Sequence, residues 1–304
     1  MRWLPALAIL FGVLTRFGAD QTWVIHPCLA LIMLAAFLER KQVEKLNLRS
    51  FVLSLLALQV GAGSVAYLIL GLWDATLAAT VLVLALTPTA LSAAAVASGA
   101  HADTRVVTSV ITANNVVAAL SLPLAFALAG TGLQATVAPF EPALLVGSTV
   151  GVPLLVAGLV HRVYPASRGW AGGTAIRAAM RMLWAIILYV SASKVGDWYA
   201  TLSYADATQY ALPALVAVLA FGFFALIGYS TQRHRRLEAL ICFSHKNSGL
   251  ALLLVLETLP LQVAAAILCY SLVQNAYFAL FLSRGTESHL VAADLAPHKA
   301  AVPN

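Results

Sequence analysis

A single lysine interrupts an apolar stretch in the last quarter of the chain. The segment LICFSHKNSGLALLL, residues 240–254, carries Lys246 with no acidic residue beside it. A lysine near a helix end can extend its ammonium group to water, but Lys246 stands about nine residues inside its apolar span, and its side chain reaches only about 6 Å. A charge in hydrocarbon costs about 2.5–3.5 kcal/mol on insertion scales, so such residues usually face a protein interior and mark function. Lys246 is therefore the first candidate for a group that binds an anion or carries a proton, and His245 is the second.

The composition defines the environment of this lysine. Of the 304 residues 61% are hydrophobic and 10% are charged, and apolar runs of membrane-spanning length recur along the chain. These features exclude a soluble domain and predict an all-α integral membrane protein, since transmembrane strands would alternate in polarity. The net charge of +6 comes from short basic clusters between apolar runs, so no nucleic-acid partner is expected. Cys28, Cys242 and Cys269 lack metal or disulfide spacing, and neither a metal nor a cofactor is expected.

Ten apolar spans can be drawn along the chain. They cover residues 3–17, 23–39, 50–71, 75–99, 104–128, 143–163, 177–194, 210–230, 237–259 and 261–282. The first resembles a signal peptide, but no small-residue cleavage pattern follows it, so we interpret it as a helix. With both termini in the cytoplasm, 15 basic residues lie inside and two lie outside. The positive-inside rule therefore favours this orientation, and we expect the chain in a membrane of the bacterial inner-membrane type.

Two of these spans contain residues that break a helix. The fourth contains LTPTALS, in which Pro88 disfavours a continuous helix, and the ninth contains SHKNSGL, in which Asn247 and Gly249 favour a turn. Both breaks lie about 14–18 Å inside their spans, near the bilayer midplane. Because each break falls in the fourth span of a set of five, the pattern predicts two inverted repeats, residues 1–134 and 135–284, followed by a cytoplasmic tail, 285–304. Matched broken helices that cross at the midplane are typical of secondary transporters that work by alternating access.

Polar residues gather at the same depth as the breaks. The free amide groups at the starts of the second half-helices, near Thr89 and Asn247, would favour an anion, and Lys246 adds a positive charge. We expect the ammonium group of Lys246 to be the cation that interacts with the unpaired carbonyl groups at the end of the half-helix that precedes it. A small carboxylate is the favoured substrate class. The candidate contacts are Thr87, Thr89, Ser109, Thr112, Asn114, Asn115, Ser244, His245, Lys246, Asn247, Ser248, Gln274 and Asn275.

At these residues the chain resembles the bile acid:sodium symporter family. Two stretches carry the resemblance: residues 85–126, ALTPTALSAAAVASGAHADTRVVTSVITANNVVAALSLPLAF, and residues 245–254, HKNSGLALLL, whose NSGLA piece is similar to the ninth-helix crossover of that family. Together they form about a sixth of the chain. The resemblance implies a ten-helix fold in which helices four and nine unwind and cross. Fold analogy does not by itself fix the chemistry.

The positions that bind sodium in this family differ in this chain. The acidic residue and the glutamine of the ninth helix correspond to Cys242 and Lys246, a Ser-Asn pair corresponds to Ala93 and Ala94, and a threonine ligand corresponds to Ile111. These side chains offer no oxygen ligands to a sodium ion. The comparison therefore predicts a sodium-independent carrier of a small organic anion, in which Lys246 replaces the sodium ions as a built-in cation and Lys246 or His245 couples transport to protons.

Other classes of protein fit the sequence less well. A channel or receptor-like membrane protein that keeps the fold without transport is the main alternative, but the polar residues cluster at one depth instead of lining a path. An intramembrane enzyme is not expected, because no nucleophile elbow, metal motif or carboxylate pair is present. Within transport, an arsenite or auxin carrier shares the broad fold, although no cysteine stands at the helix-four break.

Overall fold

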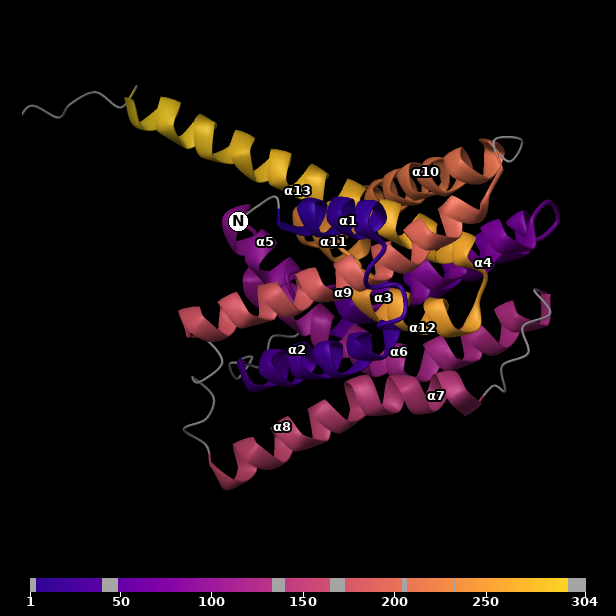
Figure 1. Cartoon of the computed structure of the whole chain (residues 1–304). Helices are drawn as coiled ribbons and strands as arrows, with labels where there is room; N and C mark the ends of the chain where they lie inside the picture. Colours follow the sequence, from indigo (N-terminus) through magenta and orange to yellow (C-terminus); the bar gives the residue numbers. More distant parts are fainter. Residues whose placement is uncertain are drawn as a thin grey trace, which may run out of the picture.

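A computed structural model describes residues 4–39, 49–132, 140–164, 173–203, 207–231 and 233–294. Across these residues the protein is built from helices, and they form no β-sheet (Figure 1). Six of the helical segments in this part of the chain are long and apolar enough to cross a membrane: Thr22–Glu39, Ser50–Leu70, Ala143–Val163, Thr174–Thr201, Ala211–Ser230 and Leu261–Leu282. The predicted class, an all-α membrane protein, is therefore confirmed.

Each of the ten expected spans corresponds to one helix or to a run of helical pieces. The helices are α1 (Leu4–Thr15), α2 (Ile25–Glu39), α3 (Arg49–Leu70), α4 (Ala75–Leu86), α5 (Ala93–Gly99), α6 (Thr104–Gly132), α7 (Phe140–Val146), α8 (Val152–Val163), α9 (Thr174–Thr201), α10 (Ala207–Thr231), α11 (Arg236–Ser244), α12 (Ser248–Thr258) and α13 (Leu261–Asp294). A 3₁₀ turn, Thr22–Val24, precedes α2, and a π-helical turn, Gly147–Gly151, joins α7 to α8.

Three boundaries differ from the sequence prediction or cannot be compared with it. The last helix continues to Asp294 and so includes the first part of the segment predicted as a tail. The predicted boundary between the repeats, at residues 134 and 135, lies outside the described residues. Residues 40–48, which carry basic residues between the second and third spans, and residues 295–304 lie outside them as well.

Both predicted helix breaks are present. Residues 87–92 separate α4 from α5, and residues 245–247 separate α11 from α12. Thr87 still donates its amide to the carbonyl of Val83, but Pro88 has no amide hydrogen and cannot continue the ladder. The second half-helix begins at Ala93 and not near Thr89 as predicted, because Thr89 is extended and pairs with the other break. For the same reason α11 ends at Ser244, two residues before Lys246.

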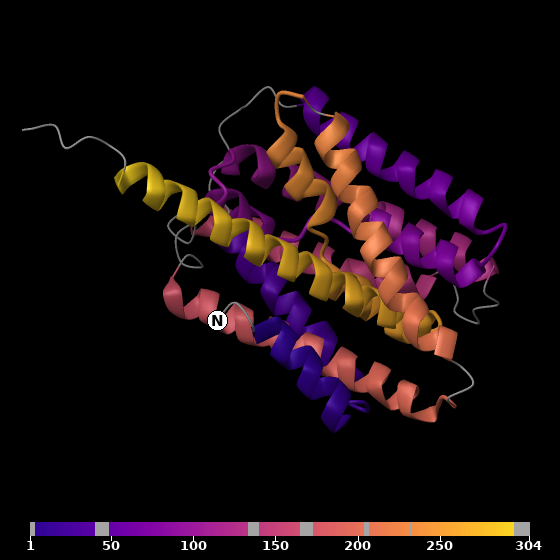
Figure 2. The ribbon, with the colours of Figure 1, turned by 90° about the horizontal axis from the view of Figure 1, so that it is seen from above.

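The helices pack as two groups. In the first group α1 lies along α9, and α2 packs on α8 and α9. In the second group α3 packs on α4, α4 packs on α6 and α13, and α10 packs on α11 and α13. The two groups meet where α9 contacts α13 (Figure 2) and α12, and where α7, which leads into α8, contacts α6. Both broken helices therefore belong to the second group, and α12 faces the first.

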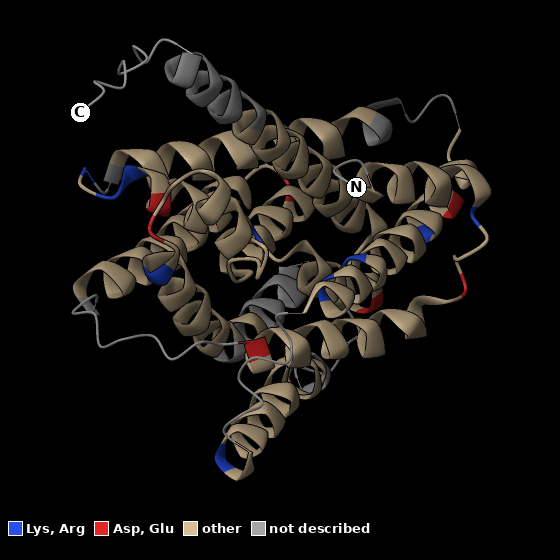
Figure 3. Ribbon diagram, turned by 90° about the vertical axis from the view of Figure 1, so that its left-hand side faces the viewer, with Lys and Arg blue, Asp and Glu red and all other residues tan. Residues whose placement is uncertain are grey.

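A cluster of charged residues connects α5 with α11 within the second group. It lies at the ends of these two helices that are remote from the breaks. The amide of Asp103 donates to Glu238 Oε1 at 3.0 Å, and the Asp103 carboxylate lies 3.8 Å from Arg235. Partial burial alone would raise the pKa of the Asp103 carboxyl, but hydrogen bonds from Arg105 hold that pKa below its usual value. Figure 3 shows that charged residues gather chiefly towards helix ends and connections.

Gly63 lets α3 approach the end of α4. A Cβ atom at position 63 would lie 2.5 Å from the Cβ of Ala85, whereas one at Gly61, on the same helix, would meet nothing within 4 Å. Alanine at either position gains helix propensity of about 0.5–1 kcal/mol over glycine.

Because α3 and α4 must separate to admit the extra methyl group, we expect Gly63→Ala to lower stability by about 1–3 kcal/mol relative to Gly61→Ala. Thermal unfolding of the two purified variants in one detergent measures the difference. Equal midpoints for the two variants would show that the contact between α3 and α4 is loose.

Candidate functional site

The two breaks cross and pair through their backbones. Thr89 and Lys246 form an isolated antiparallel bridge. The amide of Ala90 donates to the carbonyl of His245 at 2.7 Å, and the amide of Asn247 donates to the carbonyl of Pro88 at 2.8 Å. Each donor follows its bridge residue by one position, and each acceptor precedes its bridge residue by one position. The pairing is therefore symmetric about the bridge.

The side chains of the two bridge residues repeat this symmetry. Thr89 Oγ1 donates to the carbonyl of Cys242 at 2.7 Å, and Lys246 Nζ donates to the carbonyl of Ala85 at 3.1 Å. Cys242 stands four residues before Lys246, and Ala85 stands four residues before Thr89. Each bridge residue thus satisfies one of the last carbonyl groups of the opposite broken helix, groups that have no partner within their own helix.

This arrangement corrects the expected role of Lys246. The sequence places its ammonium at the end of the preceding half-helix, α11, whereas Nζ reaches the end of α4. The end of α11 is satisfied by other donors. Thr89 bonds Cys242, the amide of His245 bonds Ile241, and Tyr270 donates its hydroxyl to the carbonyl of Ser244 at 2.7 Å.

The amino group of Lys246 lies in an aromatic and apolar cage. The residue is 0% exposed. Nζ lies 5.4 Å from the ring centroid of Phe224 and 5.3 Å from that of Phe243, distances at which a cation is attracted by a ring face. Within the described residues no carboxylate forms an ion pair with Lys246. A positive charge at this position would therefore be unneutralised until an anion arrives.

Two glutamines hold the crossing from neighbouring helices. Gln274 on α13 accepts the amide of Lys246 at 2.9 Å and donates to its carbonyl at 3.1 Å. Gln59 on α3 donates to the carbonyl of Thr87 at 3.3 Å and exchanges hydrogen bonds with Asn114 on α6, whose amide also donates to Thr89 Oγ1 at 3.0 Å. The bridge is therefore supported on both sides by side-chain amides.

The sequence indicated some of these residues and missed others. Asn114, His245, Asn247 and Gln274 were predicted near the crossing and lie there. Gln59, Phe224, Phe243 and Tyr270 were not predicted. Gln59 could have been found as a lone amide within an apolar span, since such a group needs partners, but a phenylalanine in an apolar run carries no such signal.

Several of the predicted contact residues bond their own helices through their side chains, among them Ser109, whose hydroxyl bonds Arg105, and Ser244, whose hydroxyl bonds Leu240. The hydroxyl of Thr87 bonds Val83, the amide of Asn115 bonds Ile111, and that of Asn275 bonds Ser271. Thr112 is half-buried on α6. A hydroxyl or amide bonded to its own helix keeps further capacity to bond a ligand.

Three of the predicted side chains keep an unused polar atom in the interior. His245 Nε2 lies 2.9 Å from Ser92 Oγ, but its Nδ1 has no partner, and neither Asn115 Oδ1 nor Ser248 Oγ has one. Buried polar groups are normally paired, so each such atom indicates a ligand, a water molecule or strain.

The start of α12 is partly occupied in this state. Asn247 caps the helix, its side chain accepting the amide of Leu250 at 3.3 Å, and the amide of Ser248 donates to the carbonyl of Lys246 at 2.9 Å. Trp184 from α9 covers Gly249 so closely that a Cβ atom there would overlap the indole ring. Through this contact α9 of the first helix group lies against α12 of the second.

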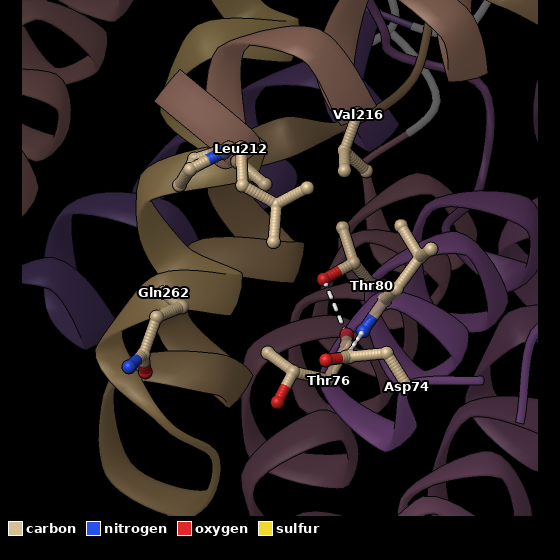
Figure 4. A pocket seen from close by; sticks show the side chains of 9 residues that line it. Asp74, Thr76, Thr80, Leu212, Val216 and Gln262 are labelled. Carbon is tan, nitrogen blue, oxygen red and sulfur yellow. Dashed lines mark hydrogen bonds between the residues drawn. The ribbon is translucent and has the colours of Figure 1, made fainter. Parts of the chain in front are cut away.

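A pocket of about 240 Å³ lies away from the crossing, at the start of α4 and near the starts of α10 and α13 (Figure 4). The residues that line it are Asp74, Thr76, Leu77, Thr80, Leu212, Pro213, Val216, Gln262 and Ala266. No feature of the sequence predicted this pocket.

Comparison with models of known protein families finds no match to this chain, and comparison with curated proteins finds no match either.

Gln274 offers a direct test of how the crossing is held. Its side-chain amide makes two hydrogen bonds to the backbone of Lys246. The carbonyl of Lys246 keeps a second donor, the amide of Ser248, so Gln274→Ala leaves one buried backbone group, the amide of Lys246, without a partner and should cost about 1–3 kcal/mol. Asn275→Ala is the matched control, because that amide bonds only Ser271 within its own helix. Thermal unfolding should rank Gln274→Ala well below Asn275→Ala, and the reverse order would contradict the assignment.

Proposed function

We propose that the protein is a secondary transporter of a small organic anion, in which Lys246 acts as a fixed cation at the crossing of two broken helices. The observation that carries the proposal is the fully buried amino group of Lys246, bonded to the carbonyl end of the opposite broken helix with no acidic partner in the described residues. Buried intramembrane lysines are costly and usually functional.

The reciprocal bonds at the crossing support the inverted-repeat topology. Thr89 and Lys246 bond carbonyl groups at equivalent positions of each other's helices, as a pseudo-two-fold axis through the bridge requires. The two halves of the chain also divide between the helix groups in the same way. In each half the first two spans belong to the first group and the last three spans belong to the second. We therefore propose ten spans in two inverted sets of five, with both termini in the cytoplasm.

The contacts at the crossing also support sodium independence, and with it a divergent place in the bile acid:sodium symporter family. Sodium needs several oxygen ligands, and two carbonyl oxygens at the crossing are already taken by Thr89 and Lys246. The side chains of Ala93, Ile111 and Cys242 are buried and supply no oxygen. A lysine ammonium supplies one positive charge and binds carbonyl oxygens through hydrogen bonds, where a sodium ion would supply one positive charge and bind such oxygens as ligands.

The unused polar atoms near Lys246 favour an anion as the substrate. An ammonium group attracts a carboxylate, and the hydroxyl of Ser248 at the start of α12 is free to donate to it. Trp184 covers this helix start. A movement of α9 with its helix group would uncover it, which is the kind of rigid-body displacement that alternating access requires.

Sodium independence is tested by transport in defined salts. The reconstituted protein should take up small carboxylates equally well in sodium, potassium or choline buffers. The increase in its thermal stability on binding these carboxylates should also be the same in the three buffers. A reproducible stabilisation by millimolar sodium, absent with potassium, would overturn the proposed role of Lys246 as the replacement for sodium.

Lys246→Arg separates a static charge from a proton carrier. The guanidinium group keeps the positive charge but does not release its proton in a working protein. If Lys246 carries the coupling proton, the variant should still bind a carboxylate but should lose accumulation driven by a proton gradient. Retention of both would leave Lys246 as a counter-charge only and would turn attention to His245.

A further inference from the structure

The pocket beside α4 has the polarity of a cation path. Asp74 is the only charged residue among those that line it, and its carboxylate accepts the amide of Leu77 at 2.7 Å as the cap of α4. Thr80 donates to the carbonyl of Thr76, and Gln262 supplies an amide at the opposite wall (Figure 4). With a carboxylate and without lysine or arginine in its lining, the pocket attracts protons and small cations and repels organic anions.

Three helices connect this pocket to Lys246. The pocket is lined by Leu77 of α4, Val216 of α10 and Ala266 of α13. Eight residues further along, these helices carry Ala85, Phe224 and Gln274, all of which contact Lys246. Residues at intervals of four lie on one face of a helix, and eight residues span about 12 Å. The same faces of α4, α10 and α13 therefore surround both the pocket and the amino group.

The layer between the pocket and Lys246 is thin. It contains Val81, Ala220 and Tyr270, one turn beyond the pocket residues on the three helices, and all three side chains are buried. The ring of Phe224 lies next, 6.3 Å from the ring of Tyr270 and 5.4 Å from Lys246 Nζ. If the ring of Phe224 moved aside, only the side chains of Val81, Ala220 and Tyr270 would separate the pocket from Lys246.

We propose that the pocket is the entrance of a water-filled proton path to Lys246, which runs between α4, α10 and α13 and is closed in this state by Phe224. This inference rests on the proposed function of Lys246. On the path, the ammonium group gives one proton to a water molecule and becomes an amine, and a hydronium ion that enters past Asp74 returns the proton. The anion approaches the crossing from the α9 side, so the two species use separate routes.

Few titratable groups accompany Lys246 on this path. Cys242 and His245 stand on its own segment, and Tyr270 faces it from α13, where its hydroxyl is held by the carbonyl of Ser244. The residues of α4 and α10 that contact Nζ offer only the carbonyl of Ala85 and the ring of Phe224. Water must therefore carry the proton between the pocket and Lys246.

The path is tested with a thiol at its inner end. In a full-length protein whose native cysteines are replaced by alanine, Lys246→Cys is treated with 2-aminoethyl methanethiosulfonate, and the rate of modification is measured by mass spectrometry. Addition of Phe224→Ala should raise this rate at least tenfold, and further addition of Thr80→Trp, which fills the pocket, should return it to the starting value. Val216→Cys in the same background, placed in the pocket itself, should react quickly with and without Phe224→Ala and should slow when Thr80→Trp fills the pocket.

Phe278→Ala is the matched control, because its ring packs 4.9 Å from that of His245, on the side of the crossing remote from the pocket. It should leave the rate unchanged. Acceleration by Phe278→Ala and not by Phe224→Ala, or acceleration by Phe224→Ala that Thr80→Trp does not reverse, would overturn the path. Ala220→Gly opens the same layer if Phe224→Ala does not fold. Because the thiol replaces the lysine, this result is independent of whether Lys246 couples transport, which Lys246→Arg decides separately.

Discussion

A helix that stops inside an apolar interior leaves carbonyl groups without donors, and this constraint shapes the whole structure. Each unpaired group would cost several kcal/mol in hydrocarbon, on the order of the stability of a domain when summed over two breaks. The protein meets the constraint by crossing the two breaks, so that the side chain at each break supplies a donor to the helix end of the other. Neither broken helix is satisfied alone. The positions of α3, α6 and α13, which supply Gln59, Asn114 and Gln274, follow from the need to hold this crossing in register.

The two side-chain hydrogen bonds at the crossing are symmetric in geometry but differ in the charge of the donor. Thr89 donates a neutral hydroxyl, and Lys246, in the equivalent position, donates from an amino group that can carry a full charge. A second threonine could provide a neutral donor without the cost of a buried charge, so the hydrogen bond alone does not account for the lysine. The additional charge is explained if an anion must be attracted to the crossing. Because this cation is covalently attached, it is present without any ion gradient, and it can be discharged only through its proton.

The sequence predicted the parts of this arrangement that depend on local chemistry. The apolar spans, the two breaks and the position of Lys246 inside the protein followed from hydropathy, from Pro88 and from the cost of a charge in hydrocarbon. The partner of Lys246 did not follow, because Ala85 acts through its backbone carbonyl, which every residue has. The predicted start of α5 and end of α11 differ from the structure for a related reason, since Thr89 and Lys246 pair as extended chain only when the two breaks meet. The roles of Phe224 and Tyr270 likewise depend on contacts between distant segments.

The central claim is that the charge of Lys246 serves the anion and not the fold. Lys246→Met keeps the length and volume of the side chain while removing the charge and its donor, and replacement of a buried charge by an apolar side chain of similar size is often neutral or stabilising. The decisive measurement is the thermal unfolding of this variant with and without a small carboxylate that stabilises the natural protein. The methionine leaves the carbonyl of Ala85 without its donor, which should cost about 1–3 kcal/mol. We therefore predict a lower unfolding midpoint than that of the natural protein in the absence of the anion, and no stabilisation by the anion. A methionine variant that the carboxylate stabilises as strongly as it stabilises the natural protein would contradict the assignment of Lys246 as the anion's cation.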